Sequence, residues 1–174
     1  VIQTTHYTYD VLGNLRAVEL PDGRLIEYLV DGMGRRIAKK VNGIVEKKWI
    51  WEGLAVVAEL NESDGIVSRF TAGGMSKNGI FYKIVRDYLG SPRLIINLEN
   101  GILAQEISYD EWGNATFDIN SEFQPFGFGD GILDLDTNLV KLGFRDYDSN
   151  IGRWCSKDRI AFSETDFNLY QYVI

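Results

Sequence analysis

Tyr9-Asp10-Val11-Leu12-Gly13-Asn14-Leu15 is followed by Val30-Asp31-Gly32-Met33-Gly34-Arg35-Arg36, and both stretches contain the pattern D-x-x-G, with the aspartates 21 residues apart. Asp in a tight turn accepts hydrogen bonds from the backbone two residues on, and Gly adopts the positive φ that such turns require. The shared pattern therefore predicts the same turn at both places.

Three further copies extend this repetition along the chain. Trp51-Glu52-Gly53-Leu54 keeps the phase, since Glu52 lies 21 residues after Asp31, but its closing glycine is missing. Asp87 to Gly90 and Asp110 to Gly113 restore the full D-x-x-G pattern, 23 residues apart. A fixed period of about 20 residues indicates an architecture of stacked supersecondary repeats.

Short turn dipeptides lie between the D-x-x-G units. Asn-Gly and Asp-Gly tolerate the positive φ values of type I′ turns, whose twist suits a β-hairpin. Each repeat is therefore interpreted as two strands and two turns. The dipeptides are Asp22-Gly23, Asn42-Gly43, Asp64-Gly65, Asn78-Gly79 and Asn100-Gly101.

The segments between the turns favour strands. Residues 25–30 and 44–51 are rich in β-branched and aromatic side chains, and no long stretch has the 3.6-residue spacing of a helix. We predict an all-β fold in which antiparallel hairpin repeats form one curved, spiral sheet. The exposed edge strands of such a sheet favour self-association.

The repetition breaks in two places. Residues 71–77 are expected to form a looser loop, and from residue 117 onward the turns are irregular and aromatic residues cluster in Phe123-Gln124-Pro125-Phe126-Gly127-Phe128. We therefore divide the chain into a hairpin segment, residues 1–116, and an irregular segment that plugs or caps the sheet, residues 117–174.

Composition narrows the classes of partner. The chain has 174 residues, 45% of them hydrophobic and 13% aromatic, which is enough to bury a sizeable core. Its formal net charge of -7 and pI near 4.8 argue against nucleic acid and anionic membrane surfaces as partners. No apolar run is long enough to span a membrane. The start lacks an initiator methionine, so we expect a piece of a longer protein.

The residue types that hold metals and cofactors are sparse, and we expect neither. Cys155 is the only cysteine and His6 the only histidine, which excludes disulfides and multi-histidine sites within the chain. Cys155 is interpreted as a packed residue. Asp134-Leu135-Asp136-Thr137-Asn138 imitates an EF-hand loop, but Leu139 and Arg145 occupy the required glycine and glutamate positions, so a polar turn is predicted.

The aspartates and glycines of the repeats are interpreted as structural turn residues rather than as a metal or sugar site. The many aromatic residues leave a surface carbohydrate-binding module as an alternative, although a β-sheet uses such side chains in its core. The turn residues are Asp10, Gly13, Asp31, Gly34, Asp87, Gly90, Asp110 and Gly113.

These patterns resemble the Rhs or YD-repeat family. Tyr9-Asp10 and Tyr109-Asp110 match the motif that names the family, and the C-terminal stretch is similar to its Rhs-associated core. The stretches that carry this second resemblance are Gly143-Phe144-Arg145-Asp146-Tyr147-Asp148, Gly152-Arg153-Trp154, Ser156-Lys157-Asp158 and Asn168-Leu169-Tyr170-Gln171-Tyr172-Val173.

The resemblance implies a function. Members such as the C components of bacterial Tc toxins and Rhs effectors of contact-dependent or type VI systems wind YD hairpins into a hollow shell around a variable C-terminal toxin, and the core plugs one end. The implied role is a structural shell segment of a secreted or cell-surface bacterial protein. Its implied partners are the remaining shell repeats and a toxin domain beyond this chain.

In many members the core is also an aspartyl autoprotease with two aspartates in D-P-x-G motifs and an upstream arginine. By resemblance, Asp158 holds the first aspartate position and Arg145 the arginine position. Arg159 replaces the proline and Ala161 the glycine, and the second aspartate would lie beyond Ile174. The enzymatic alternative is thus an autoprotease that is incomplete in this chain.

We predict that the 174-residue chain does not cleave itself, because peptide hydrolysis by carboxylates uses a close pair that shares one proton. Mass spectrometry after prolonged incubation should find only the intact chain. A shorter stable product that disappears in Asp158→Asn would contradict this prediction.

Overall fold

The computed structural model describes residues 4–157, 170 and 172. They form a 12-stranded sheet in which every strand pairs with its sequence neighbours, and a 4-stranded sheet of the same meander type. All pairings are antiparallel, so the predicted all-β hairpin fold is confirmed. The one helix among the described residues is the short 3-10 turn η1 (Phe128–Asp130), and no described helix is long and apolar enough to cross a membrane.

The strands of the large sheet follow one another with short turns between them. They are β1 (His6–Tyr9), β2 (Leu15–Glu19), β3 (Leu25–Val30), β4 (Arg36–Val41), β5 (Ile44–Glu52), β6 (Ala55–Leu60), β7 (Ile66–Thr71), β8 (Gly74–Lys77), β9 (Ile80–Arg86), β10 (Pro92–Asn97), β11 (Leu103–Tyr109) and β12 (Ala115–Asp118). The small sheet contains β13 (Ile132–Asp134), β14 (Leu139–Leu142), β15 (Arg145–Asp148) and β16 (Arg153–Trp154).

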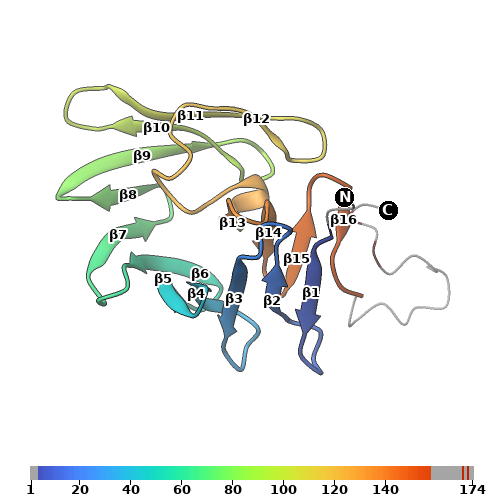
Figure 1. The fold of residues 1–174 in the computed structure, drawn as a ribbon. Coiled ribbons are helices and arrows are strands. Elements are labelled where there is room, and N and C mark those ends of the chain that lie inside the picture. Colours follow the sequence, from blue (N-terminus) through green and yellow to red (C-terminus); the bar gives the residue numbers. More distant parts are fainter. Residues whose placement is uncertain (1–3, 158–169, 171, 173–174) are drawn as a thin grey trace.

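The large sheet bends into an open arc, and the small sheet lies within its hollow beside β1 to β3 (Figure 1). We call residues 119–157, which follow β12 and include the small sheet, the plug. Side chains alternate along the strands: in β9, Tyr82 and Ile84 are buried, while Phe81 and Val85 face outward. The buried face of the arc is therefore the face that the plug covers.

Two apolar clusters join the sheet to the plug. In one, residues of β5 to β10, including Phe70 and Ile95, pack with Phe126 and Ile132 of the plug. In the other, residues of β2 and β3 pack on Leu139 of β14. A sheet with one apolar face must bury it against another layer, and here the chain supplies that layer itself.

The D-x-x-G turns share one geometry. In the first, Asp10 Oδ1 accepts hydrogen bonds from the backbone N–H groups of Leu12 and Asn14, both at 2.9 Å, and Gly13 has φ +75°. This is a type I turn closed by a left-handed residue, a common three-residue hairpin loop. The same pair of bonds recurs at Asp31, Asp87 and Asp110.

The residue that closes such a turn often binds the second carboxylate oxygen. Asn114 Nδ2 donates to Asp110 Oδ2 at 2.8 Å, and Arg35 Nε donates to Asp31 Oδ2 at 2.7 Å. The hydrogen bonds from the Asn114 side chain and backbone hold the pKa of Asp110 below its usual value. Each aspartate thus serves its own hairpin.

All five turn dipeptides lie between paired strands, so the predicted hairpins are confirmed, but only Asn42-Gly43 and Asn78-Gly79 have the positive φ at both residues that a type I′ turn requires. Asp22-Gly23, for example, closes a longer loop in which Leu20 pairs with Arg24. The segment 71–77 is no loose loop but the β7–β8 hairpin, because Met75 is buried in the core and anchors β8.

Because the sheet is a meander, successive turns lie at opposite ends of its strands. We call the row of strand ends that carries the D-x-x-G turns the motif edge. It contains the four motif turns and, between them, two turns that lack the motif, Gly53-Leu54 and Ala72-Gly73. Turns that recur at a regular interval in the sequence therefore lie in one row along the sheet.

Gly13→Ala should lower the free energy of unfolding by about 1–2 kcal/mol, because alanine is strained in the left-handed region. A Cβ at Gly13 would meet no atom within 4 Å, so any loss of stability in this variant comes from backbone strain and not from a steric clash. Gly32→Ala, at a turn position without positive φ and with equally open surroundings, is the matched control. Urea denaturation measures both, and equal stability of the two variants would contradict the assigned turn geometry.

Candidate functional site

The candidate functional site is the polar contact between the large sheet and the plug. Its most buried part joins Arg36 of β4 to Asp146 of β15, with Nη2 and Oδ1 2.6 Å apart. Lys141 Nζ lies 3.2 Å from the other carboxylate oxygen of Asp146. Only 1% of Arg36 is exposed, and its guanidinium lies 3.6 Å from the ring centroid of Tyr28. One carboxylate therefore bridges a cation of the sheet and a cation of the plug.

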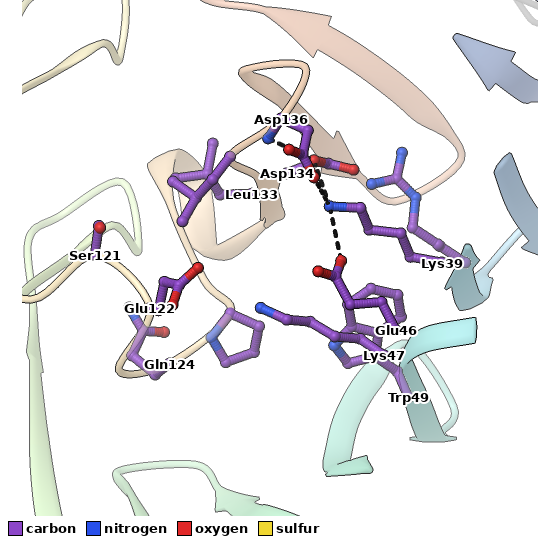
Figure 2. A pocket seen from close by; sticks show the side chains of 13 residues that line it. Lys39, Glu46, Lys47, Trp49, Ser121, Glu122, Gln124, Leu133, Asp134 and Asp136 are labelled. Carbon is purple, nitrogen blue, oxygen red and sulfur yellow. Dashed lines mark hydrogen bonds and ion pairs between the residues drawn. The ribbon is translucent and has the colours of Figure 1, made fainter. Parts of the chain in front are cut away.

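A second ionic cluster surrounds Lys39 (Figure 2). Its ammonium lies 3.0 Å from Asp134 Oδ1, 2.5 Å from Asp136 Oδ2 and 3.2 Å from Glu46 Oε2. Tyr28 donates its hydroxyl proton to the other oxygen of Asp134 at 2.7 Å. Arg24 also pairs with Asp136. Two sheet strands thus hold the loop between β13 and β14.

The contacts of the Lys39 cluster shift the pKa values of its charged groups. Burial alone would lower the pKa of Lys39, but the charge of Asp134 and the hydrogen bonds with Asp136 and Asp134 outweigh burial and raise it. Burial likewise opposes ionisation of Asp136, yet its hydrogen bonds from Lys39 and Arg24 lower the pKa of that carboxyl. Lys39 and Asp136 are therefore both charged at neutral pH.

Charged pairs of this kind specify an arrangement more than they stabilise it, because desolvation offsets most of the Coulomb attraction. An alternative docking of the plug would separate Arg36 and Lys39 of the sheet from Asp146, Asp134 and Asp136 of the plug. We conclude that these residues determine the position of the plug against the sheet.

The motif edge also touches the plug directly. A Cβ added at Gly113 would lie 2.3 Å from Phe128, and one at Gly34 would lie 3.1 Å from Phe144. Asn114 Nδ2 donates to the carbonyl oxygen of Ser149 at 3.0 Å. The turn residues that close the hairpins therefore also fit the plug surface.

Aromatic rings fill the centre of the plug. Tyr147 stacks on Phe128 with 5.8 Å between centroids and donates its hydroxyl proton to the carbonyl oxygen of Trp112 at 2.8 Å. Tyr172 packs on Tyr147 and on Trp154, with centroids 4.5 Å and 5.3 Å apart. This stack connects the motif edge to the last residue that the structure describes.

The two residues assigned to autoproteolysis are not brought together in the described part of the chain. Arg145 lies at the start of β15, with its guanidinium 3.9 Å from the ring centroid of Trp154. Asp158 lies outside the described residues. The autoprotease assignment therefore stays a prediction.

The stretch that imitates an EF-hand loop forms the predicted polar turn between β13 and β14, and its carboxylates also bind the sheet. Asp134 and Asp136 bind the ammonium of Lys39, and no group of three or more metal-ligating side chains occurs within residues 4–157.

Burial, followed by the charges of Asp146 and Asp148, raises the pKa of Cys155 to about 12, so its thiol is protonated. A protonated thiol is a poor nucleophile.

A small polar pocket of about 130 Å³ adjoins the Lys39 cluster (Figure 2). Lys47 of the sheet and Glu122 and Gln124 of the plug line it. Its volume is below the range of about 300–1,000 Å³ that is usual for ligand sites. Carbohydrate binding therefore finds no support in this pocket and stays an untested alternative.

Asp146→Asn should destabilise the chain by about 3–5 kcal/mol, because it removes the negative charge that faces the buried guanidinium of Arg36. Asp64→Asn, which removes the exposed pair between Lys48 and Asp64, should cost about 1 kcal/mol or less. Chemical denaturation of both variants tests the difference. A loss for Asp146→Asn as small as for Asp64→Asn would show that the buried cluster does not hold the plug.

Comparison with known proteins shows where this architecture occurs. The teneurin YD-shell family profile matches residues 1–173. Teneurin-3 of Danio rerio is 30% identical over 168 residues, which cover 86% of this chain and 6% of that protein. Double-stranded DNA deaminase toxin A of Burkholderia cenocepacia (strain H111) is 26% identical over 98% of this chain and 15% of its own length.

Solved structures share the fold. The crystal structure of TcdB2-TccC3 matches with a TM-score of 0.71 at 17% identity, over 97% of this chain and 10% of that one. TcdB2-TccC3 without its hypervariable C-terminal region matches equally well, with a TM-score of 0.71 at 18% identity, over 97% of this chain and 9% of that one. This chain therefore spans only a small part of its relatives, and it belongs to the teneurin YD-shell family.

Proposed function

We propose that this chain forms part of the wall of a protein shell, together with the plug that closes it, and that the shell encloses a domain that follows residue 174 in the full-length protein. The observation that carries the proposal is the plug on the concave face, held by Arg36–Asp146 and the Lys39 cluster. A sheet that buries its concave face on its own C-terminal segment directs that segment inward.

Two relatives support a toxin as the enclosed domain. One is named a double-stranded DNA deaminase toxin, and one solved structure is described as lacking a hypervariable C-terminal region. Teneurins carry the same shell domain, so the shell also occurs outside toxins. We propose a secreted or cell-surface toxin of bacterial type as the full-length protein, because the C-terminal stretch of this chain resembles the Rhs-associated core.

The remaining shell repeats are the second proposed partner. Among the strands that the structure describes, β1 pairs only with β2, and all four of its residues are exposed. An edge strand of this kind can accept a further strand through its backbone. In the full-length protein, preceding hairpins would extend the sheet there, and an isolated chain would instead self-associate through the same edge.

Limited proteolysis of the full-length protein tests the enclosure. The segment beyond residue 174 should resist protease while the shell is folded. Asp146→Asn should speed its digestion by about tenfold or more, because local opening controls cleavage. Asp64→Asn should leave the rate unchanged. Digestion of the segment in the unmodified protein as fast as in denaturant would show that it lies outside the shell.

A further inference from the structure

Glu59 of β6 carries a carboxylate on the buried face of the large sheet, outside the two ionic clusters described above. It pairs with Trp49 of β5 on one side and with Ser68 of β7 on the other. Residues that lie directly opposite each other on antiparallel strands point to the same face of the sheet. Trp49 belongs to the apolar core that packs on the plug, so Glu59 and Ser68 also face the plug.

Lys77 of β8 continues this line of side chains, because it pairs with Ser68. Its ammonium donates to the carbonyl oxygen of Phe123 at 2.6 Å and lies 4.8 Å from the centre of the Phe123 ring. Phe123 belongs to the plug, and its ring packs edge-on against Tyr82 of the sheet with centroids 5.0 Å apart. The line therefore ends in a direct contact with the plug. We call its four members the polar row: Trp49, Glu59, Ser68 and Lys77.

The polar row is buried but incompletely hydrogen-bonded. Trp49, Glu59 and Ser68 are 5%, 8% and 1% exposed, respectively. Within the part of the chain that the structure describes, the indole N–H of Trp49 and the hydroxyl of Ser68 have no hydrogen-bond partner, and Glu59 forms neither a hydrogen bond nor an ion pair. The other buried carboxylates, Asp134 and Asp146, both bind cations. An ionised Glu59 is therefore disfavoured, because a buried charge is costly without close partners.

Three charged side chains surround Glu59. Lys47 of β5 and Lys77 of β8 favour its ionised form from two sides, and Glu122 of the plug acts on Lys77. Burial outweighs the two lysines and raises the pKa of Glu59. Burial also lowers the pKa of Lys77, against the charge of Glu59. Glu59 therefore takes up a proton at a higher pH than an ordinary glutamate does.

A proton changes which hydrogen bonds Glu59 can form. An ionised carboxylate only accepts hydrogen bonds, whereas a protonated one also donates through its O–H group. Protonated Glu59 can donate to the hydroxyl oxygen of Ser68 and still accept from the indole N–H of Trp49, its two neighbours in the polar row. Both of the unpaired neighbours then gain a partner, and no uncompensated charge stays buried.

We propose that Glu59 is a pH-sensitive switch in the sheet: on acidification it binds a proton, which completes the polar row and strengthens the sheet beneath the plug. Because the folded chain binds this proton more tightly than the unfolded chain, Glu59 favours folding in acid. This contribution is lost as the pH rises through the pKa of Glu59 in the folded chain. The switch belongs to the wall itself and does not require an enclosed domain.

Glu59→Gln imitates the protonated side chain, and urea denaturation at about pH 5 and at about pH 8 tests the switch. At the higher pH the unfolding equilibrium constant of the variant should be smaller than that of the unmodified chain by about threefold or more. At the lower pH this ratio should approach one. Glu62→Gln, the same change in an exposed turn, is the matched control and should give the same ratio at both pH values.

Carbon-13 NMR of the side-chain carboxyl of Glu59 follows the uptake of the proton directly. Its titration midpoint should lie above that of a glutamate in a short unstructured peptide. Since this measurement uses the unmodified chain, it decides the case even if Glu59→Gln folds poorly. A midpoint at or below the peptide value, or a stability ratio for Glu59→Gln that does not change with pH, would overturn the switch.

Discussion

The carboxylate of Asp146 lies between Arg36 of the sheet and Lys141 of the plug, and the position of the plug depends on this buried contact. Arg36 and Asp146 are both buried away from water, so each requires the other as its counter-charge. Apolar packing around Phe126 and Leu139 joins the same two layers. The ionic contacts add charged partners that must meet for the plug to dock, so they favour one arrangement of the plug against the sheet.

The motif turns serve two purposes with the same residues. Asp110 closes its hairpin through two backbone hydrogen bonds, while Gly113 and Asn114 of the same turn contact Phe128 and Ser149 of the plug. A repeat that had only to close a hairpin could use any left-handed residue. The close approach of Phe128 adds a steric reason for glycine at position 113. Leu54, in a turn that lacks the motif, instead lines a cavity between the sheet and the plug.

Local patterns predicted much of the fold. The period of Asp10 and Asp31 indicated hairpin repeats, and the strands occur where β-branched and aromatic residues cluster. The type of each turn could not be predicted from its dipeptide, because loop length and sheet twist decide whether a dipeptide such as Asp22-Gly23 forms a type I′ turn. The segment 71–77 was misread for a related reason: Met75 makes β8 a strand through burial, which its glycine-rich surroundings do not reveal.

The sequence by itself determined the antiparallel hairpin repeat and the role of its aspartates and glycines in turns. Only the tertiary structure decided that Arg36 and Lys39 are buried and that Asp134, Asp136 and Asp146 are their partners. These pairs join residues 95 to 110 positions apart in the chain. Their meeting depends on how far the sheet curves, and curvature accumulates from small twists at every strand rather than from any one motif.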